Sequence, residues 1–227
     1  MTFKLIEVDP TSDFDELIEC EWASYETPNQ NFFRLYCPIH GTGPTARADS
    51  LRECTRRRLD WHKSDPSSYW QKVVNSECKI VGGALWKICP TYTLKKIDSH
   101  SQVSWYPEGG QRDYVAAALE RIHAVRKKVE SRPQVFLTTI FTHPDYRHQG
   151  VADLMMNWGI QKADQMGVEM WLNATVYGLP LYKKHGFTVV DEIDASPIAD
   201  NASDEWRNMA RRSEPMNMWQ MWRPVGG

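Results

Sequence analysis

The residues best suited to chemistry lie between positions 140 and 152, where an apolar stretch meets a proline turn and then a predicted helix. That helix opens with the run Arg147-His148-Gln149-Gly150-Val151-Ala152. The first turn of a helix has N–H groups without intrahelical partners and the positive end of the dipole. Gly150 and Ala152 keep large side chains away, so a phosphate can approach the backbone closely. The pattern predicts a pyrophosphate site, and no Gly-Lys-Ser/Thr follows that would indicate an ATP phosphate loop.

A second motif follows at positions 171–187, where Trp171-Leu172-Asn173-Ala174-Thr175 precedes a short predicted helix that ends in Tyr182-Lys183-Lys184-His185-Gly186-Phe187. Taken in order, the two motifs resemble the GNAT superfamily of N-acetyltransferases. That family has Arg/Gln-x-x-Gly-x-Gly/Ala after a strand and, later, Tyr-x-x-x-Gly-Phe. The close match covers residues 134–190, and combinations such as Thr142-His143-Pro144 are most similar to small fungal members.

The resemblance implies that this chain binds acetyl-CoA and needs no metal. In the family, helix-start amides hold the pyrophosphate, and the preceding strand splays from its neighbour so that its backbone can bind the pantetheine amides. One strand N–H could also stabilise the oxyanion. The coenzyme-binding residues implied here are Ile140, Phe141, Thr142, Arg147, His148, Gln149, Gly150, Val151, Ala152 and Asn173.

The same resemblance implies a catalytic role for Tyr182, whose family counterpart reaches the thioester sulfur. A phenol has a pKa of about 10 and a thiol of about 8.5, so we expect Tyr182 to hydrogen-bond the departing thiolate rather than protonate it fully. Asn173 departs from the family pattern, because many relatives have an acidic residue there. We expect His143 to shape the turn before the helix.

The general base is left open by the sequence. An alkylammonium has a pKa of about 10.4 and must lose a proton before it attacks, which a carboxylate or histidine can accept through water. Four residues lie in regions that reach the site, and the sequence does not choose between them: Glu21, Glu26, Asp98 and His100.

The acceptor site is implied by family position to lie over residues 27–44 and beside residues 194–215. We predict that the acceptor contacts Glu26, Phe32, Phe33 and Tyr36, and Trp105 and Tyr106 could line the same pocket. The aromatic residues favour an apolar or aromatic amine over an aminoglycoside. No strongly acidic segment is present to attract a polycation such as a histone tail.

Apolar periodicity predicts an α/β fold in which strands alternate with helices. Strands are predicted over residues 4–8, 70–74, 79–88, 134–142, 168–172, 187–193 and 216–222; helices are predicted from about 13, over 47–62, from 113, and over 150–166 and 179–185. The resemblance implies a mixed, largely antiparallel sheet of about six to seven strands with a splayed pair, flanked by helices. We expect one domain over residues 1–227, with a polar, irregular lid loop over 194–215.

Composition fits a globular protein of 227 residues with a formal net charge of −2. No bulk positive field exists for nucleic acid or an anionic membrane, and we interpret the Arg56-Arg57-Arg58 run as a solvated helix face. Five scattered cysteines and the lack of an apolar run of about 20 residues favour a reducing, cytoplasmic location. We expect a monomer or homodimer whose partners are acyl-CoA and a small-molecule amine.

Two alternatives keep the fold but change the function, because fold does not determine chemistry. The first is an enzyme of other chemistry, such as O-acyl transfer or decarboxylation. The second is a non-catalytic protein that binds acyl-CoA or a metabolite. The presence of Tyr182 argues against the second alternative, and the lack of an identified base argues for it.

Overall fold

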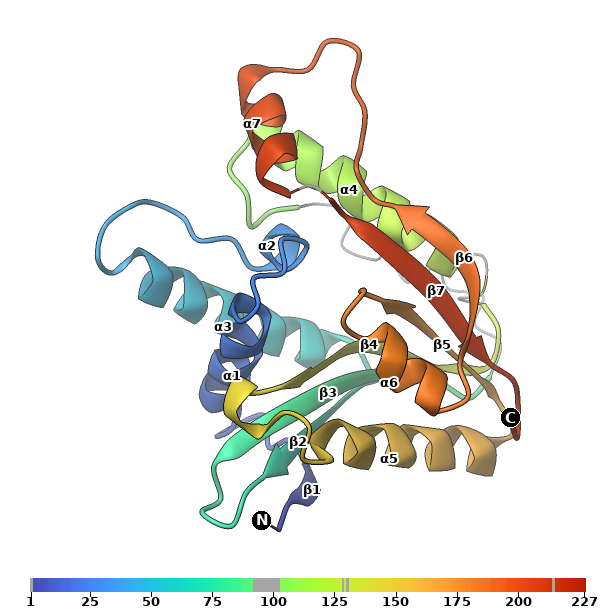
Figure 1. Cartoon of the computed structure of the whole chain (residues 1–227). Helices are drawn as coiled ribbons and strands as arrows, with labels where there is room; N and C mark the ends of the chain where they lie inside the picture. The colour runs from blue at the N-terminus through green and yellow to red at the C-terminus, as the bar shows by residue number, and fades with distance from the viewer. Residues whose placement is uncertain (1, 92–102, 128, 130, 214) are drawn as a thin grey trace.

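The computed structural model of this chain describes residues 2–91, 103–127, 129, 131–213 and 215–227. Its centre is a seven-stranded sheet in the order β1-β2-β3-β4-β5-β7-β6 (Figure 1). The strands are β1 (Lys4–Glu7), β2 (Ser68–Val74), β3 (Ile80–Cys89), β4 (Gln134–Thr142), β5 (Glu169–Ala174), β6 (Thr188–Asp194) and β7 (Asn217–Arg223). The sheet confirms the expected mixed, largely antiparallel fold class, and every strand end lies within two residues of its predicted position.

The parallel pair β4–β5 separates part-way along its length. The two strands pair from Gln134 opposite Glu169 to Leu137 opposite Leu172, whereas β4 stays paired with β3 as far as Thr142 opposite Gly82. Residues 138–142 therefore have a neighbouring strand on one side only. Along this stretch, alternate backbone N–H and C=O groups face the gap. This is the splayed strand pair that the family resemblance implies.

Helices cover both faces of the sheet. They are α1 (Phe14–Glu26), α2 (Phe33–Tyr36), α3 (Ala46–Ser64), α4 (Gly110–Lys127), α5 (Val151–Met166), α6 (Leu179–Lys184) and α7 (Asp204–Ser213), with a 3-10 turn η1 (Pro144–Tyr146) before α5. Helices α1 and α3 pack on one face, and α5 packs on the other (Figure 1). The buried stripe of α5, Val151, Met155, Met156 and Ala163, has helical spacing and faces the sheet.

The polar segment 194–215 contains a helix that the sequence does not predict. Helix α7 packs against α4, where the rings of Trp206 and Tyr114 lie 5.3 Å apart. The Glu205 carboxylate accepts a 2.8 Å hydrogen bond from the N–H of Gly110 at the start of α4. The expectation of an irregular loop is wrong for residues 204–213, because tertiary contacts stabilise a helix whose own sequence is mostly polar.

The arginine run on α3 also differs from prediction. Arg56 is exposed, but Arg57 and Arg58 are 8% and 9% exposed. The Arg57 guanidinium packs on two neighbouring indoles, 4.7 Å from the ring centroid of Trp61 and 4.8 Å from that of Trp105. The interpretation as a solvated face is therefore wrong for these two residues. In the described part of the chain, no helix has the length and apolar content that crossing a bilayer requires.

Candidate active site

The predicted phosphate site lies where β4 passes through η1 into α5. His143 shapes this turn, because its Nδ1 accepts the N–H of Asp145 at 3.4 Å. Gly150 caps α5 with φ 86°, and a Cβ built at Gly150 would meet nothing within 4 Å. Space is thus open directly beside the N–H groups of the first turn of α5. A phosphate could approach the backbone there.

Arg147 adds a positive charge to this turn. Its Nη2 donates a 2.7 Å hydrogen bond to the Ser24 carbonyl on α1. Burial lowers the pKa of Arg147, and no carboxylate of the described residues pairs with its guanidinium. The charge is therefore available to an anion. The residues of the turn fit a pyrophosphate by backbone donors, open space and charge.

A cavity of about 1510 Å³ begins at this turn and extends to α1 and α2. Many predicted coenzyme residues line it: Ile140, Phe141, Thr142, Arg147, His148, Gly150, Val151, Ala152 and Asn173. Gln149 does not, because its side-chain amide donates to the Asp145 carbonyl at 3.0 Å. None of the described residues between 194 and 215 lines the cavity, so the predicted lid segment lies away from it in this structure.

The gap between β4 and β5 opens into the same cavity. Asn173 lies on the β5 side, where its Nδ2 donates to the Ile122 carbonyl at 3.4 Å. Its buried Oδ1 has no hydrogen-bond partner among the described residues. A buried acceptor without a partner destabilises the structure unless a ligand or water supplies the donor. Asn173 therefore offers an acceptor to a ligand N–H in the gap.

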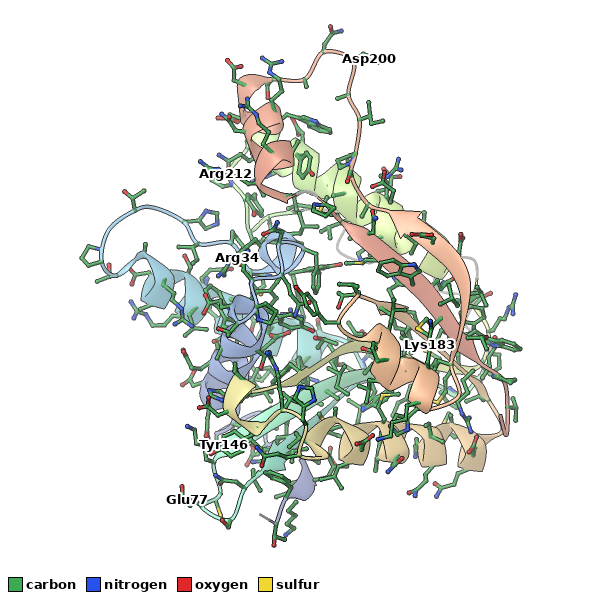
Figure 2. The ribbon with its side chains drawn as sticks, viewed as in Figure 1. Arg34, Glu77, Tyr146, Lys183, Asp200 and Arg212 are labelled. Carbon is green, nitrogen blue, oxygen red and sulfur yellow. The ribbon has the colours of Figure 1, made fainter. Side chains whose placement is uncertain are left out.

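Tyr182 on α6 faces the cavity and is 7% exposed. Burial raises the pKa of its phenol well above the ordinary value, so the hydroxyl remains protonated and able to donate. Gly178 helps to place the ring, because a Cβ at position 178 would lie 2.6 Å from Cε2 of Tyr182. On the same helix, Lys183 is exposed (labelled in Figure 2).

The predicted aromatic residues form part of the wall opposite α5. Phe32, Phe33 and Tyr36 all line the cavity, and Phe33 stacks on Tyr25 with ring centroids 4.7 Å apart. Sequence reasoning did not identify Trp61 or His123, which line the same wall from α3 and α4. No local motif marks these two residues. Only the tertiary fold brings them beside α2.

Trp105 and Tyr106 do not line the cavity but hold α2 in place from behind. Trp105 Nε1 donates to the Leu35 carbonyl and the Tyr106 hydroxyl donates to the Arg34 carbonyl, both at 2.8 Å. Arg57 Nη2 donates to the Tyr36 carbonyl at 2.9 Å. Three consecutive carbonyls of this four-residue helix are thus bonded by side chains.

The four candidate bases fall in different places. Glu26 lies outside the cavity lining and pairs with Arg34 at 2.6 Å and Arg47 at 2.9 Å (Arg34 is labelled in Figure 2). Burial acts to raise the pKa of Glu26, but the two arginines outweigh it and hold the pKa below its usual value. Glu21 does line the cavity and is fully buried. Asp98 and His100 lie outside the described residues.

Comparison with known proteins identifies the family. The model of the acetyltransferase (GNAT) family matches residues 29–187. The chain belongs to the GNAT family. An acetyltransferase from the fungus Stachybotrys chartarum is 28% identical over 92 residues, which is 39% of this GNAT chain and 40% of that protein. The matched region therefore spans less than half of this relative.

Solved GNAT structures share the fold over nearly the whole chain. Arylalkylamine N-acetyltransferase 2 from Aedes aegypti has a TM-score of 0.66, with 14% identity and coverage of 99% of this chain and 100% of the other. A histone acetyltransferase HPA2 and related acetyltransferase from Corynebacterium glutamicum has a TM-score of 0.59, with 18% identity and coverage of 99% and 97%. The PaiA N-acetyltransferase from Thermoplasma acidophilum, solved with coenzyme A, has a TM-score of 0.50, with 13% identity and coverage of 99% of both. At these identities the likeness establishes the GNAT fold.

Proposed function

We propose that this protein transfers the acetyl group of acetyl-CoA to the amine of a small apolar or aromatic molecule. The observation that carries the proposal is the single cavity that connects the open turn at Gly150, the gap beside β4, Tyr182 and the aromatic wall of α1 and α2. An acyltransferase must bring two ligands end to end, and such a cavity supplies both compartments. Alignment of the reactants contributes much of the rate in reactions of this kind.

Different residues of the coenzyme compartment suit different groups of the coenzyme. The N–H groups at the start of α5 and the charge of Arg147 suit a pyrophosphate, while residues 138–142 and the free Oδ1 of Asn173 suit amide groups. The bound coenzyme would supply the activated acyl group as a thioester. Tyr182 would donate its hydroxyl proton in a hydrogen bond to the sulfur that leaves.

The acceptor compartment supports an apolar amine. Phe32, Phe33 and Tyr36 present aromatic surface to the cavity, and Trp61 adds an indole. Aromatic walls bind apolar and aromatic groups, and they also attract an ammonium group through the faces of the rings. Arylalkylamine N-acetyltransferase 2 of Aedes aegypti, a structural neighbour, is named for acceptors of this class.

Calorimetric titration tests the coenzyme part of the proposal. We expect micromolar binding of acetyl-CoA and coenzyme A, and comparison with dephospho-coenzyme A measures what the 3′-phosphate contributes. Release of free thiol in the presence of arylalkyl and alkyl amines, with aminoglycosides as the contrasting set, then tests acyl transfer. Absence of coenzyme binding would overturn the proposal. Binding without transfer to any amine would instead favour a binding protein or another reaction.

Tyr182→Phe should lower kcat about 10- to 100-fold, because hydrogen bonds to charged groups contribute about 1.5–3 kcal/mol. Coenzyme affinity should change little, since the sulfur carries no charge before the reaction. Steady-state kinetics and calorimetry measure the two effects separately. Tyr69→Phe is the matched control, because the Tyr69 hydroxyl bonds Glu7 outside the cavity. A Tyr182→Phe enzyme with the turnover of the Tyr69→Phe enzyme would exclude the leaving-group role.

A further inference from the structure

A short chain of hydroxyl groups connects the gap in the sheet with a buried carboxylate. The Tyr25 hydroxyl lies 3.2 Å from the Ile140 carbonyl and 2.9 Å from Thr139 Oγ1. Thr139 Oγ1 in turn donates to Glu21 Oε1 at 3.5 Å. All three side chains line the cavity. The last distance is long for a hydrogen bond, as is common at catalytic sites before substrate binds.

Glu21 differs from the surface carboxylates of this chain. It is 0% exposed, its Oε1 lies 3.2 Å from Arg58 Nη2, and its Oε2 has no hydrogen-bond partner among the described residues. The counter-ion that Glu21 contacts is Arg58, which is itself buried and stabilises the ionised carboxylate. A second proton-accepting oxygen of this cavity-lining residue therefore has no donor committed to it.

The surroundings of Glu21 set its basicity. The titratable and charged groups that act on it are Cys20 and Tyr25 on α1, Cys37 after α2, and Cys54, Arg57 and Arg58 on α3. Burial raises the pKa of Glu21 from 4.5 to about 7, against the opposing attraction of Arg58. That shift makes the carboxylate a stronger base than an exposed glutamate.

We propose that Glu21 takes up the proton that the acceptor amine loses, with the hydroxyls of Tyr25 and Thr139 as the relay. The ammonium proton moves to the Tyr25 oxygen as the Tyr25 proton moves to Thr139 and the Thr139 proton moves to Glu21. One N–H bond breaks, one carboxylic acid O–H bond forms, and both hydroxyls are restored. The proton returns to solvent after the product leaves. This inference rests on the proposed acyl transfer to an amine.

In this proposal, the buried Glu21–Arg58 pair lies where the relay needs a proton acceptor. Glu26, the carboxylate five residues further along α1, is held by Arg34 and Arg47 and lies outside the cavity lining. Glu21 instead lies on the side of α1 that faces Thr139 and the gap. Tyr25, one helical turn later, places its hydroxyl at the Ile140 carbonyl, where the gap begins to widen.

The pH dependence of kcat/KM tests the relay. For the wild-type enzyme we expect activity to rise as pH passes through about 7, because Glu21 must be ionised to accept a proton. This rising part of the pH profile should stay at the same pH when the acceptor is replaced by an amine of different pKa. A rise caused by ionisation of the amine itself would move with the pKa of the amine. Glu21→Gln should remove the fixed rise and lower kcat/KM about 100-fold or more, with coenzyme affinity unchanged.

Thr139→Val tests the relay while keeping both members of the Glu21–Arg58 pair. Valine has the shape of threonine and suits a strand, but it breaks the hydroxyl chain. We expect a loss of about 10- to 100-fold in kcat/KM, since general acid–base steps contribute about 10²–10⁴-fold. Thr139→Ser, which restores the hydroxyl, should recover most of it.

The outcomes separate the relay from the proposed function. An active wild-type enzyme whose Thr139→Val variant keeps the rate and the fixed rise would overturn the relay and leave acyl transfer in place. So would a serine variant as slow as the valine variant. A wild-type protein that binds acetyl-CoA but acetylates no amine would overturn both.

Discussion

Gly150→Glu should reduce the affinity for coenzyme A about 100-fold or more. The substitution places a side chain in the open space at the start of α5, with a negative charge where we propose a pyrophosphate binds. Hydrogen bonds to charged groups contribute about 1.5–3 kcal/mol each, so the loss of two of them accounts for a factor of this size. Calorimetric titration with coenzyme A measures the change.

Gly167→Glu is the matched control for this prediction. Gly167 ends the same helix with a left-handed φ of 64°, and a Cβ there also meets nothing within 4 Å. Backbone strain and added charge are therefore alike in the two variants, but Gly167 lies outside the cavity lining. If both variants bind coenzyme A like the wild-type protein, the phosphate site does not lie at the start of α5.

Arg58→Ala should lower the free energy of unfolding by about 3–5 kcal/mol near pH 8, because it leaves a buried carboxylate without its counter-ion. Glu21 has a folded pKa of about 7, raised from 4.5, so the folded state takes up a proton between these values. Its ionised form therefore destabilises the fold increasingly as pH rises through 7. At pH 5.5 Glu21 is mostly protonated, and the loss should be smaller. Urea denaturation at the two pH values measures the difference.

Arg56→Ala supplies the comparison for this stability prediction. Arg56 is exposed and lies two residues away on the same helix, so we expect a change within about 0.5 kcal/mol at both pH values. Equal losses for the two variants, or a loss for Arg58→Ala that does not depend on pH, would contradict the assignment of Glu21 as a buried, titrating partner of Arg58.

The phosphate turn could be predicted from sequence because its parts are adjacent in the chain. The strand, the His143-Pro144 turn, Gly150 and the apolar stripe of α5 all fall within about two dozen residues. Each carries a local signal: a proline, a glycine or a periodicity. The splayed pair came from family resemblance, and the separation of β4 from β5 after Leu137 confirms it.

The acceptor wall and the relay could not be predicted in the same way. Thr139 and Glu21 are 118 residues apart in the chain, and no local pattern connects them. Arg57 and Arg58 have the appearance of a surface run, because polar residues become buried only when distant partners such as Trp105 and Glu21 meet them. Helix α7 was not predicted either, because its stability comes from contacts with α4, which is distant in the sequence.

The side-chain hydrogen bonds to three successive carbonyls of α2 make the opening of the acceptor wall measurable through two buried cysteines. An isolated four-residue helix is not stable in water, so α2 depends on tertiary contacts, among them the hydrogen bonds from Arg57, Trp105 and Tyr106. Cys37 directly follows α2, its sulfur lies 2.9 Å from that of Cys54 on α3, and both residues are 0% exposed. Their labelling rate, referenced to the exposed Cys78, thus counts how often the acceptor side of the cavity opens while the sheet stays folded.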